Sequence, residues 1–252
     1  FRNVTGVQTC ALPIYRESEH AFSLAMSITP NDPDIAYNRA FNLATIGDHR
    51  SAIGFYRAAL TPSPDNPERL MNMATSLKAT GAVVEALDLY DKVVNDHPHC
   101  LEALYNRGVL YQEIGNLENA IEDYETVLEI NPHHKLALLN QGTVYQLQNK
   151  LSAAYESYQA LSVIDPSDAR VGWNMALVSL AMEDFDRGWL LYENRFNNPD
   201  FHKLYSAIPA IKNWTGESIT PGMKFLVLHE QGLGDSIQFC RYLRCLSDRG
   251  AI

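Results

Sequence analysis

Five asparagines of this chain lie 34 residues apart without a gap, and this period limits the possible folds more than any other feature. They are Asn38, Asn72, Asn106, Asn140 and Asn174. Prolines keep the same period eight residues before the asparagines, where a proline ends one helix and begins the next turn. Tyrosines keep it eighteen residues after them, at Tyr56, Tyr90, Tyr124, Tyr158 and Tyr192. The chain is therefore predicted to repeat one helical unit five times.

Each unit is predicted to contain two helices joined by a tight turn. Two residues after each asparagine stands Ala or Gly, which lets a neighbouring helix approach closely. Gly47, Gly81 and Gly115 follow seven residues later, where a left-handed backbone would end the helix, and Asn149 also suits that position. Glu183 occupies it in the fifth unit, so that turn is expected to close differently. In the second helix a small residue lies four positions before each tyrosine, so both are predicted to face the core.

These columns of small, aromatic and proline residues resemble the tetratricopeptide repeat over residues 31 to about 198. The resemblance implies an all-α solenoid, a right-handed superhelix of helix pairs in which the first helix of each pair lines the concave surface. Residues 15–30 resemble the second helix of a further repeat whose first helix is missing. Residues 15–198 are thus predicted to form a half repeat followed by five full repeats.

Both ends of the chain are predicted to be incomplete or artificial. Residues 4–14, VTGVQTCALPI, look like a sequencing-library adapter translated in frame, so residues 1–14 are expected to make no packed contact with the repeats. The chain stops at Ile252, soon after a second type of domain is predicted to begin. We therefore expect the sequence to be a fragment.

The region after the repeats carries the pattern of a nucleotide-type α/β domain. Residues 199–222 contain three prolines and are predicted to be a linker, and residues 223–252 are predicted to begin the new domain. There the apolar run 224–229 predicts a buried strand, followed by a glycine loop and a helix. Gly232 and Gly234 would expose backbone N–H groups that suit a phosphate or another anion. The loop lacks the third glycine of dinucleotide sites and the lysine of P-loops, which argues against NAD and P-loop binding.

The stretch from NWTGE through FLVLHEQGLGDSIQFCRYL resembles the junction in bacterial proteins that carry tetratricopeptide repeats ahead of a GT-B glycosyltransferase domain. That domain is related to the heptosyltransferases and to O-GlcNAc transferase. The resemblance implies that Asp235 is the general base for the acceptor, and that a nucleotide-sugar donor binds a C-terminal lobe beyond Ile252. The fragment itself is then expected to be inactive. The alternative is that Asp235, with Gln238 three residues later, only caps the helix.

The asparagine column has a functional and a structural interpretation. An amide can donate and accept, so a row of amides could hold a peptide backbone whatever its side chains, and the resemblance to O-GlcNAc transferase implies such a row. Alternatively, the asparagines satisfy polar groups inside the stack. A clamp for carboxylates would need several concave Lys and Arg residues, and Lys78 is the only good candidate.

Composition excludes several other functions. With a net charge of −10 and no basic stripe, nucleic acid is not expected as a partner, and no apolar run is long enough to span a membrane. The four cysteines and the histidines near the turns do not have the spacing of disulfide or metal sites, so we expect reduced thiols, a cytoplasmic location and neither metal nor cofactor.

Three functions remain. The favoured one is a polypeptide-binding solenoid that recruits substrates to a glycosyltransferase domain in the full-length protein. The others are a non-enzymatic adaptor between proteins, and a sugar transferase acting on glycans whose repeats serve assembly.

Overall fold

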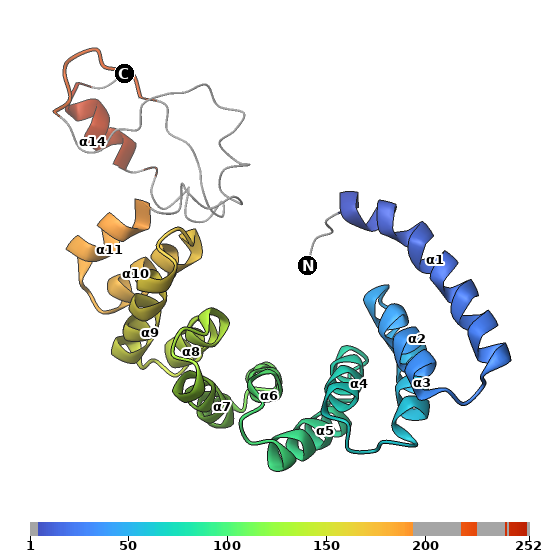
Figure 1. Cartoon of the computed structure of the whole chain (residues 1–252). Coiled ribbons are helices and arrows are strands. Elements are labelled where there is room, and N and C mark those ends of the chain that lie inside the picture. The colour runs from blue at the N-terminus through green and yellow to red at the C-terminus, as the bar shows by residue number, and fades with distance from the viewer. Residues whose placement is uncertain (1–4, 194–217, 226–239, 241, 251–252) are drawn as a thin grey trace. The chain divides into compact units, whose positions relative to one another are not determined.

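The computed structural model describes residues 5–193, 218–225, 240 and 242–250, with side chains described from residue 17 onward (Figure 1). The chain divides into two compact units, residues 1–202 and residues 203–252. Each unit is considered separately below.

The first unit contains the five predicted helix pairs (Figure 1). The first helices are α2 (Pro33–Thr45), α4 (Pro67–Ala79), α6 (Leu101–Glu113), α8 (Lys135–Leu147) and α10 (Ala169–Ala181). The second helices are α3 (His49–Leu60), α5 (Val83–Asp96), α7 (Leu117–Ile130), α9 (Leu151–Ile164) and α11 (Phe185–Tyr192). The prediction of an all-α repeat solenoid is therefore confirmed.

Local sequence explains where the first helices begin. The side chain of Asp32 accepts hydrogen bonds from the N–H groups of Asp34 and Ile35, which would otherwise lack a partner at the start of α2. The side chain of Asn66 caps α4 in the same way. In both helices a proline follows the cap, where its fixed backbone angle suits the first turn.

Neighbouring helices stack along the chain, and each packs on the one before it and the one after it. In addition α2 contacts α4, α4 contacts α6, and α6 contacts α8. These direct contacts bring the first helices from α2 to α8 together on one side of the stack. We call the surface formed by α2, α4, α6, α8 and α10 the inner row.

The predicted tyrosine column forms the centre of this core. Tyr56, Tyr90, Tyr124 and Tyr158 are at most 1% exposed, while Tyr192 in the last pair is half-buried. The small residues facing the column are required by close packing, since a Cβ atom on Gly142 would lie 2.5 Å from Cε1 of Tyr158. The period of the sequence thus identified the core correctly.

The turns inside the pairs are left-handed in all five units. Gly47, Gly81 and Gly115 have φ angles of 90°, 83° and 81°, and Asn149 has a φ of 58°. Glu183 has a φ of 63°, so the prediction that the fifth turn closes differently was wrong. The N–H of the next residue, Asp184, donates to the carbonyl of Ser179 at 3.0 Å, as happens in the other turns. This bond and the packing of the pair outweigh the steric cost of about 1 kcal/mol for a non-glycine residue.

Helix α1 spans Thr5–Ile28 and precedes the first pair. Its second half packs on α2: Ser18 donates to Asn42 at 3.0 Å, and Glu19 forms an ion pair with Arg39 at 2.9 Å. This is the contact expected of a second helix from a preceding half repeat. The helix also includes residues 5–14 of the predicted adapter segment, whose side chains lie outside the described part, so their expected lack of packing stays a prediction.

In the second unit the described residues include one helix, α14 (Tyr242–Asp248), which lies within the predicted helical stretch. Lys224 and Phe225 have no regular secondary structure, and the rest of the predicted strand falls outside the described residues. The same is true of Gly232, Gly234 and Asp235 and of most of the predicted linker. No strand occurs in the described ranges, so the α/β domain stays a prediction. No described helix is both long and apolar enough to cross a membrane.

Candidate polypeptide-binding surface

The inner row carries the five asparagines at one equivalent position of its five helices. Asn38 on α2 is exposed, and the other four are half-buried. Since successive first helices from α2 to α8 are in contact, the amides of Asn38, Asn72, Asn106 and Asn140 follow one another along a continuous surface, and Asn174 holds the same position on α10. We call Asn38, Asn72, Asn106, Asn140 and Asn174 the asparagine row.

Two of these asparagines are fixed by tyrosines of the preceding repeat. Nδ2 of Asn72 donates to the hydroxyl of Tyr37 at 2.7 Å, and Nδ2 of Asn140 donates to the hydroxyl of Tyr105 at 3.1 Å. Burial raises the pKa of both phenols above the ordinary value of 10.0, so they remain protonated. The structural interpretation therefore holds in part for these two amides.

The other asparagines lack such a partner. Within the described residues, Asn38, Asn106 and Asn174 form no side-chain hydrogen bond. For Asn106 and Asn174 the reason is local sequence, because the place of the tyrosine in the preceding repeat is taken by Met71 or Leu139. The row thus combines fixed amides with amides whose donors and acceptors are open to a ligand.

Sequence reasoning missed a second set of polar residues, one turn after the fixed asparagines. The hydroxyl oxygen of Thr75 lies 3.0 Å from that of Tyr90, and the hydroxyl oxygen of Thr143 lies 3.2 Å from that of Tyr158. From the inner row, the two threonines thus supply hydrogen-bond partners for two of the buried tyrosine hydroxyls. A threonine in every second repeat was the signal that could have identified them.

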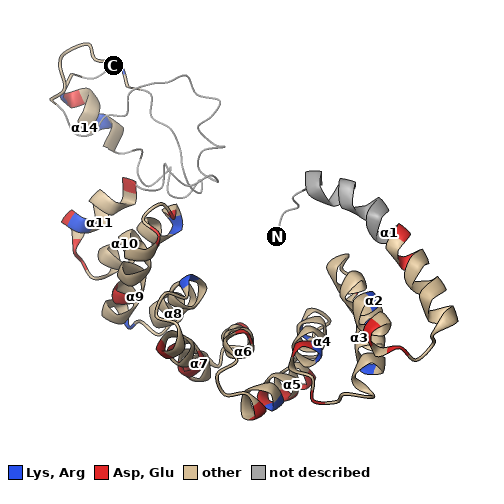
Figure 2. Cartoon of the chain, viewed as in Figure 1, with Lys and Arg blue, Asp and Glu red and all other residues tan. Residues whose placement is uncertain are grey.

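All six basic side chains on the five first helices are engaged in ion pairs. Figure 2 marks the Lys, Arg, Asp and Glu positions along these helices. The pairs are Arg39 with Glu19, Arg69 with Asp34, Lys78 with Glu113, Arg107 with Asp91 and Asp123, Lys135 with Asp165, and Arg170 with Asp168. Lys78, the candidate for a carboxylate clamp, has its Nζ 2.6 Å from a carboxylate oxygen of its partner. These cations are neutralised within the protein, which argues against a clamp for acidic peptides.

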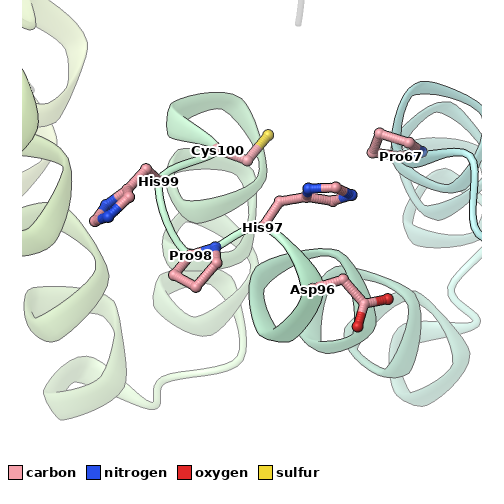
Figure 3. A pocket seen from close by; sticks show the side chains of 6 residues that line it. All are labelled: Pro67, Asp96, His97, Pro98, His99 and Cys100. Atoms are coloured by element: carbon pink, nitrogen blue, oxygen red, sulfur yellow. The ribbon is translucent and has the colours of Figure 1, made fainter.

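A separate open pocket of ≈ 470 Å³ lies at the turn between α5 and α6, where Asp96, His97, His99 and Cys100 stand close together in sequence (Figure 3). The side chains of His97 and His99 point away from each other across this turn (Figure 3). Nowhere in the described part do three potential metal ligands gather. We therefore place the candidate site on the inner row and not in this pocket.

Comparisons with known proteins agree with the repeat architecture. A model named tetratricopeptide repeat matches residues 101–134, and a model named tetratrico peptide repeat matches residues 33–105. Comparison with curated protein sequences gave no significant match.

Several solved structures share the fold. The MamA protein has 20% identity and a TM-score of 0.62, and the match covers 71% of this chain and 98% of MamA. YrrB, described as a TPR protein with an unusual peptide-binding site, has 18% identity and a TM-score of 0.60, covering 73% of this chain and 95% of YrrB. A tetratricopeptide repeat protein from Parabacteroides merdae has 27% identity and a TM-score of 0.58, covering 69% and 72%. The matched repeats over residues 33–134, and the same helix pairs continuing to Tyr192, show a tetratricopeptide-repeat fold, an architecture that indicates a scaffold for protein–protein interaction.

Proposed function

We propose that this chain is a polypeptide-binding scaffold whose asparagine row holds an extended segment by its backbone. The observation that carries the proposal is an amide at the same position of the first helix in each of five successive pairs. An asparagine amide offers donors and an acceptor, which match the carbonyl and N–H groups of a peptide bond. Packed helices lie about 8–10 Å apart, and an extended chain advances about 3.3 Å per residue. One asparagine would therefore meet about every third residue of the bound segment.

The hydrogen bonds within the row support this function. The bonds to Tyr37 and Tyr105 hold the amides of Asn72 and Asn140 in place before a ligand arrives, which lowers the entropy lost on binding. The bond to Tyr37 uses one N–H of Asn72, so the second N–H and the carbonyl oxygen of this amide stay available. A solved protein of similar fold, YrrB, is itself described as having a peptide-binding site.

Replacing Asn106 by alanine is expected to weaken polypeptide binding by about 1 kcal/mol, the typical net contribution of one hydrogen bond. The melting temperature should stay the same, because this side chain has no described partner to lose. Replacing Asn72 should weaken binding similarly and also cost some stability, since the hydroxyl of Tyr37 loses a donor. Calorimetric titration with peptides selected for binding, together with thermal melting followed by circular dichroism, checks both.

Asn95→Ala is the matched control, because Asn95 is an exposed asparagine on the second helix α5. It should change neither quantity. A loss of stability without a change in affinity for Asn72, Asn106 and Asn140 variants would contradict the proposal and leave the row with a structural role.

We further propose that the scaffold recruits its polypeptide to a glycosyltransferase domain in the full-length protein, with Asp235 as the general base. The support is the sequence of residues 213–243, with a glycine loop and an aspartate after an apolar run. The test is an assay of the full-length protein with nucleotide-sugar donors and with peptide and glycan acceptors. Transfer to peptides supports the proposal, transfer to glycans alone supports the assembly role of the repeats, and no transfer leaves an adaptor.

A further inference from the structure

We propose that the polypeptide held by the asparagine row is basic and partly apolar, with a Lys or Arg side chain at Glu68 and an apolar side chain on Phe41. This inference rests on the proposed function and adds the chemistry of the partner. The two residues lie on α2 and α4, the first helices of the first two described pairs.

The charges of the inner row favour a cation. Every Lys and Arg on the first helices is already paired, and the chain has a net charge of −10. Glu68 on α4 and Glu102 on α6 are exposed and form no ion pair with any described residue. Both stand at the second position of their helices, one repeat apart. The inner row therefore offers unpaired negative charge and no unpaired positive charge.

Two arginines, Arg39 in the middle of α2 and Arg69 in the first turn of α4, are paired with other carboxylates and not with Glu68. Arg39 pairs with Glu19 on α1, and its guanidinium lies 4.3 Å from the ring centre of Phe55. Arg69 pairs with Asp34 and donates to the carbonyl of Ala59 at 2.6 Å. Neither arginine forms an ion pair with Glu68, so its carboxylate is open to a cation from a ligand.

Glu68 is connected to the asparagine row itself. The hydroxyl of Tyr37 donates to Oε1 of Glu68 at 2.5 Å and accepts from Nδ2 of Asn72 at 2.7 Å. This chain of hydrogen bonds positions the carboxylate beside an amide that would bind the peptide backbone. A basic side chain and the backbone of one segment can thus be bound together.

Phe41 supplies the apolar contact, and it does so at a cost to the fold. It follows Asn38 by one helical turn, at the position held by Thr75 and Thr143 in the second and fourth repeats. Those threonines satisfy tyrosine hydroxyls, but a phenylalanine cannot. In the third repeat Val109 holds this position, and the hydroxyl of Tyr124 donates to Gln112 instead. The first repeat has Ala44 in place of that glutamine, so the hydroxyl of Tyr56 is buried without a partner in the described structure, while Phe41 is 54% exposed.

The unsatisfied hydroxyl of Tyr56 costs stability, and Phe41 occupies a position where a threonine would remove that cost. Residues that break local rules in this way are characteristic of functional sites. Contact with an apolar ligand side chain accounts for Phe41, as ion pairing with a ligand accounts for Glu68.

The test is selection of a displayed random library of 12-residue peptides on the whole chain. We expect selected peptides to be enriched in Lys and Arg over Asp and Glu, and to carry an apolar residue. Glu68→Gln can still accept the hydrogen bond from Tyr37. It should lower the affinity for a selected peptide by about two- to fivefold, the range of an exposed ion pair. The same substitution should not change the affinity for a version of the peptide whose basic residues are replaced by glutamine.

Phe41→Thr provides the second measurement. It should lower the affinity for the selected peptides. It should also raise the melting temperature of the protein, because a threonine there can form a hydrogen bond with the hydroxyl of Tyr56, as Thr75 does with that of Tyr90. Acidic or charge-neutral selected peptides, or unchanged affinity in both variants, would overturn the inference and leave the proposed function intact if Asn106→Ala still weakens binding. A library that yields no binder overturns both.

Discussion

Replacing Arg107 by methionine is expected to destabilise the protein by about 3–5 kcal/mol, the usual effect of removing one partner of a buried ion pair. The guanidinium donates to both carboxylate oxygens of Asp123 at 2.6 and 2.9 Å and to Asp91 at 2.7 Å. The side chain of Asp123 is 4% exposed, so methionine would leave its charge buried without a partner. Burial opposes the charge on Arg107, but the bonds and charges of Asp123 and Asp91 outweigh it and raise the pKa of Arg107.

Chemical denaturation followed by circular dichroism measures this loss. Arg57→Met is the matched control, because the side chains of Arg57 and its partner Glu85 are 60% and 59% exposed. Such a surface pair contributes at most about 1 kcal/mol. Adding Asp123→Leu to Arg107→Met should recover most of the stability by removing the unpaired charge. Equal losses in the two arginine variants, or no recovery in the double variant, would show that the buried pair is not the cause.

Raising the pH above 10 is expected to unfold the repeats as the tyrosine column ionises. Burial raises the pKa of Tyr56 to about 12, and it also raises the pKa of Tyr90, Tyr124 and Tyr158 above the ordinary 10.0. A pKa that is higher in the folded state means that the stabilisation is complete below pH 10. It is then lost as the pH rises from 10 through the folded values, since the unfolded chain ionises more easily.

Tyrosinate absorbance and helical circular dichroism, recorded against pH, check this prediction. The two signals should change together in one steep step above pH 10. Tyr90→Phe with Tyr158→Phe removes two ionising groups and should move the step to higher pH. Tyrosinate that forms gradually while the helices stay intact would contradict the assignment of these phenols to a rigid core.

The sequence predicted the helix pairs, the buried tyrosines and the positions of the asparagines because each depends on one period and one helix face. It could not predict which asparagines are fixed. The bond from Asn72 to Tyr37 joins residues 35 apart, and it depends on how two side chains meet across a helix interface. It also failed at Glu183, where packing and a turn hydrogen bond override the local backbone preference. The proposed roles of Asp235 and its loop concern residues outside the described part.

The contacts between successive first helices have a mechanical consequence. Each helix pair is held only by its neighbours, so the stack can open one unit at a time. A polypeptide bound along the asparagine row would contact several units, so the separation of any one unit from its neighbour would also break contacts with the polypeptide. Longer segments would then dissociate more slowly than their extra hydrogen bonds alone require. The affinity of the protein would therefore depend on the length of the extended segment as well as on its composition.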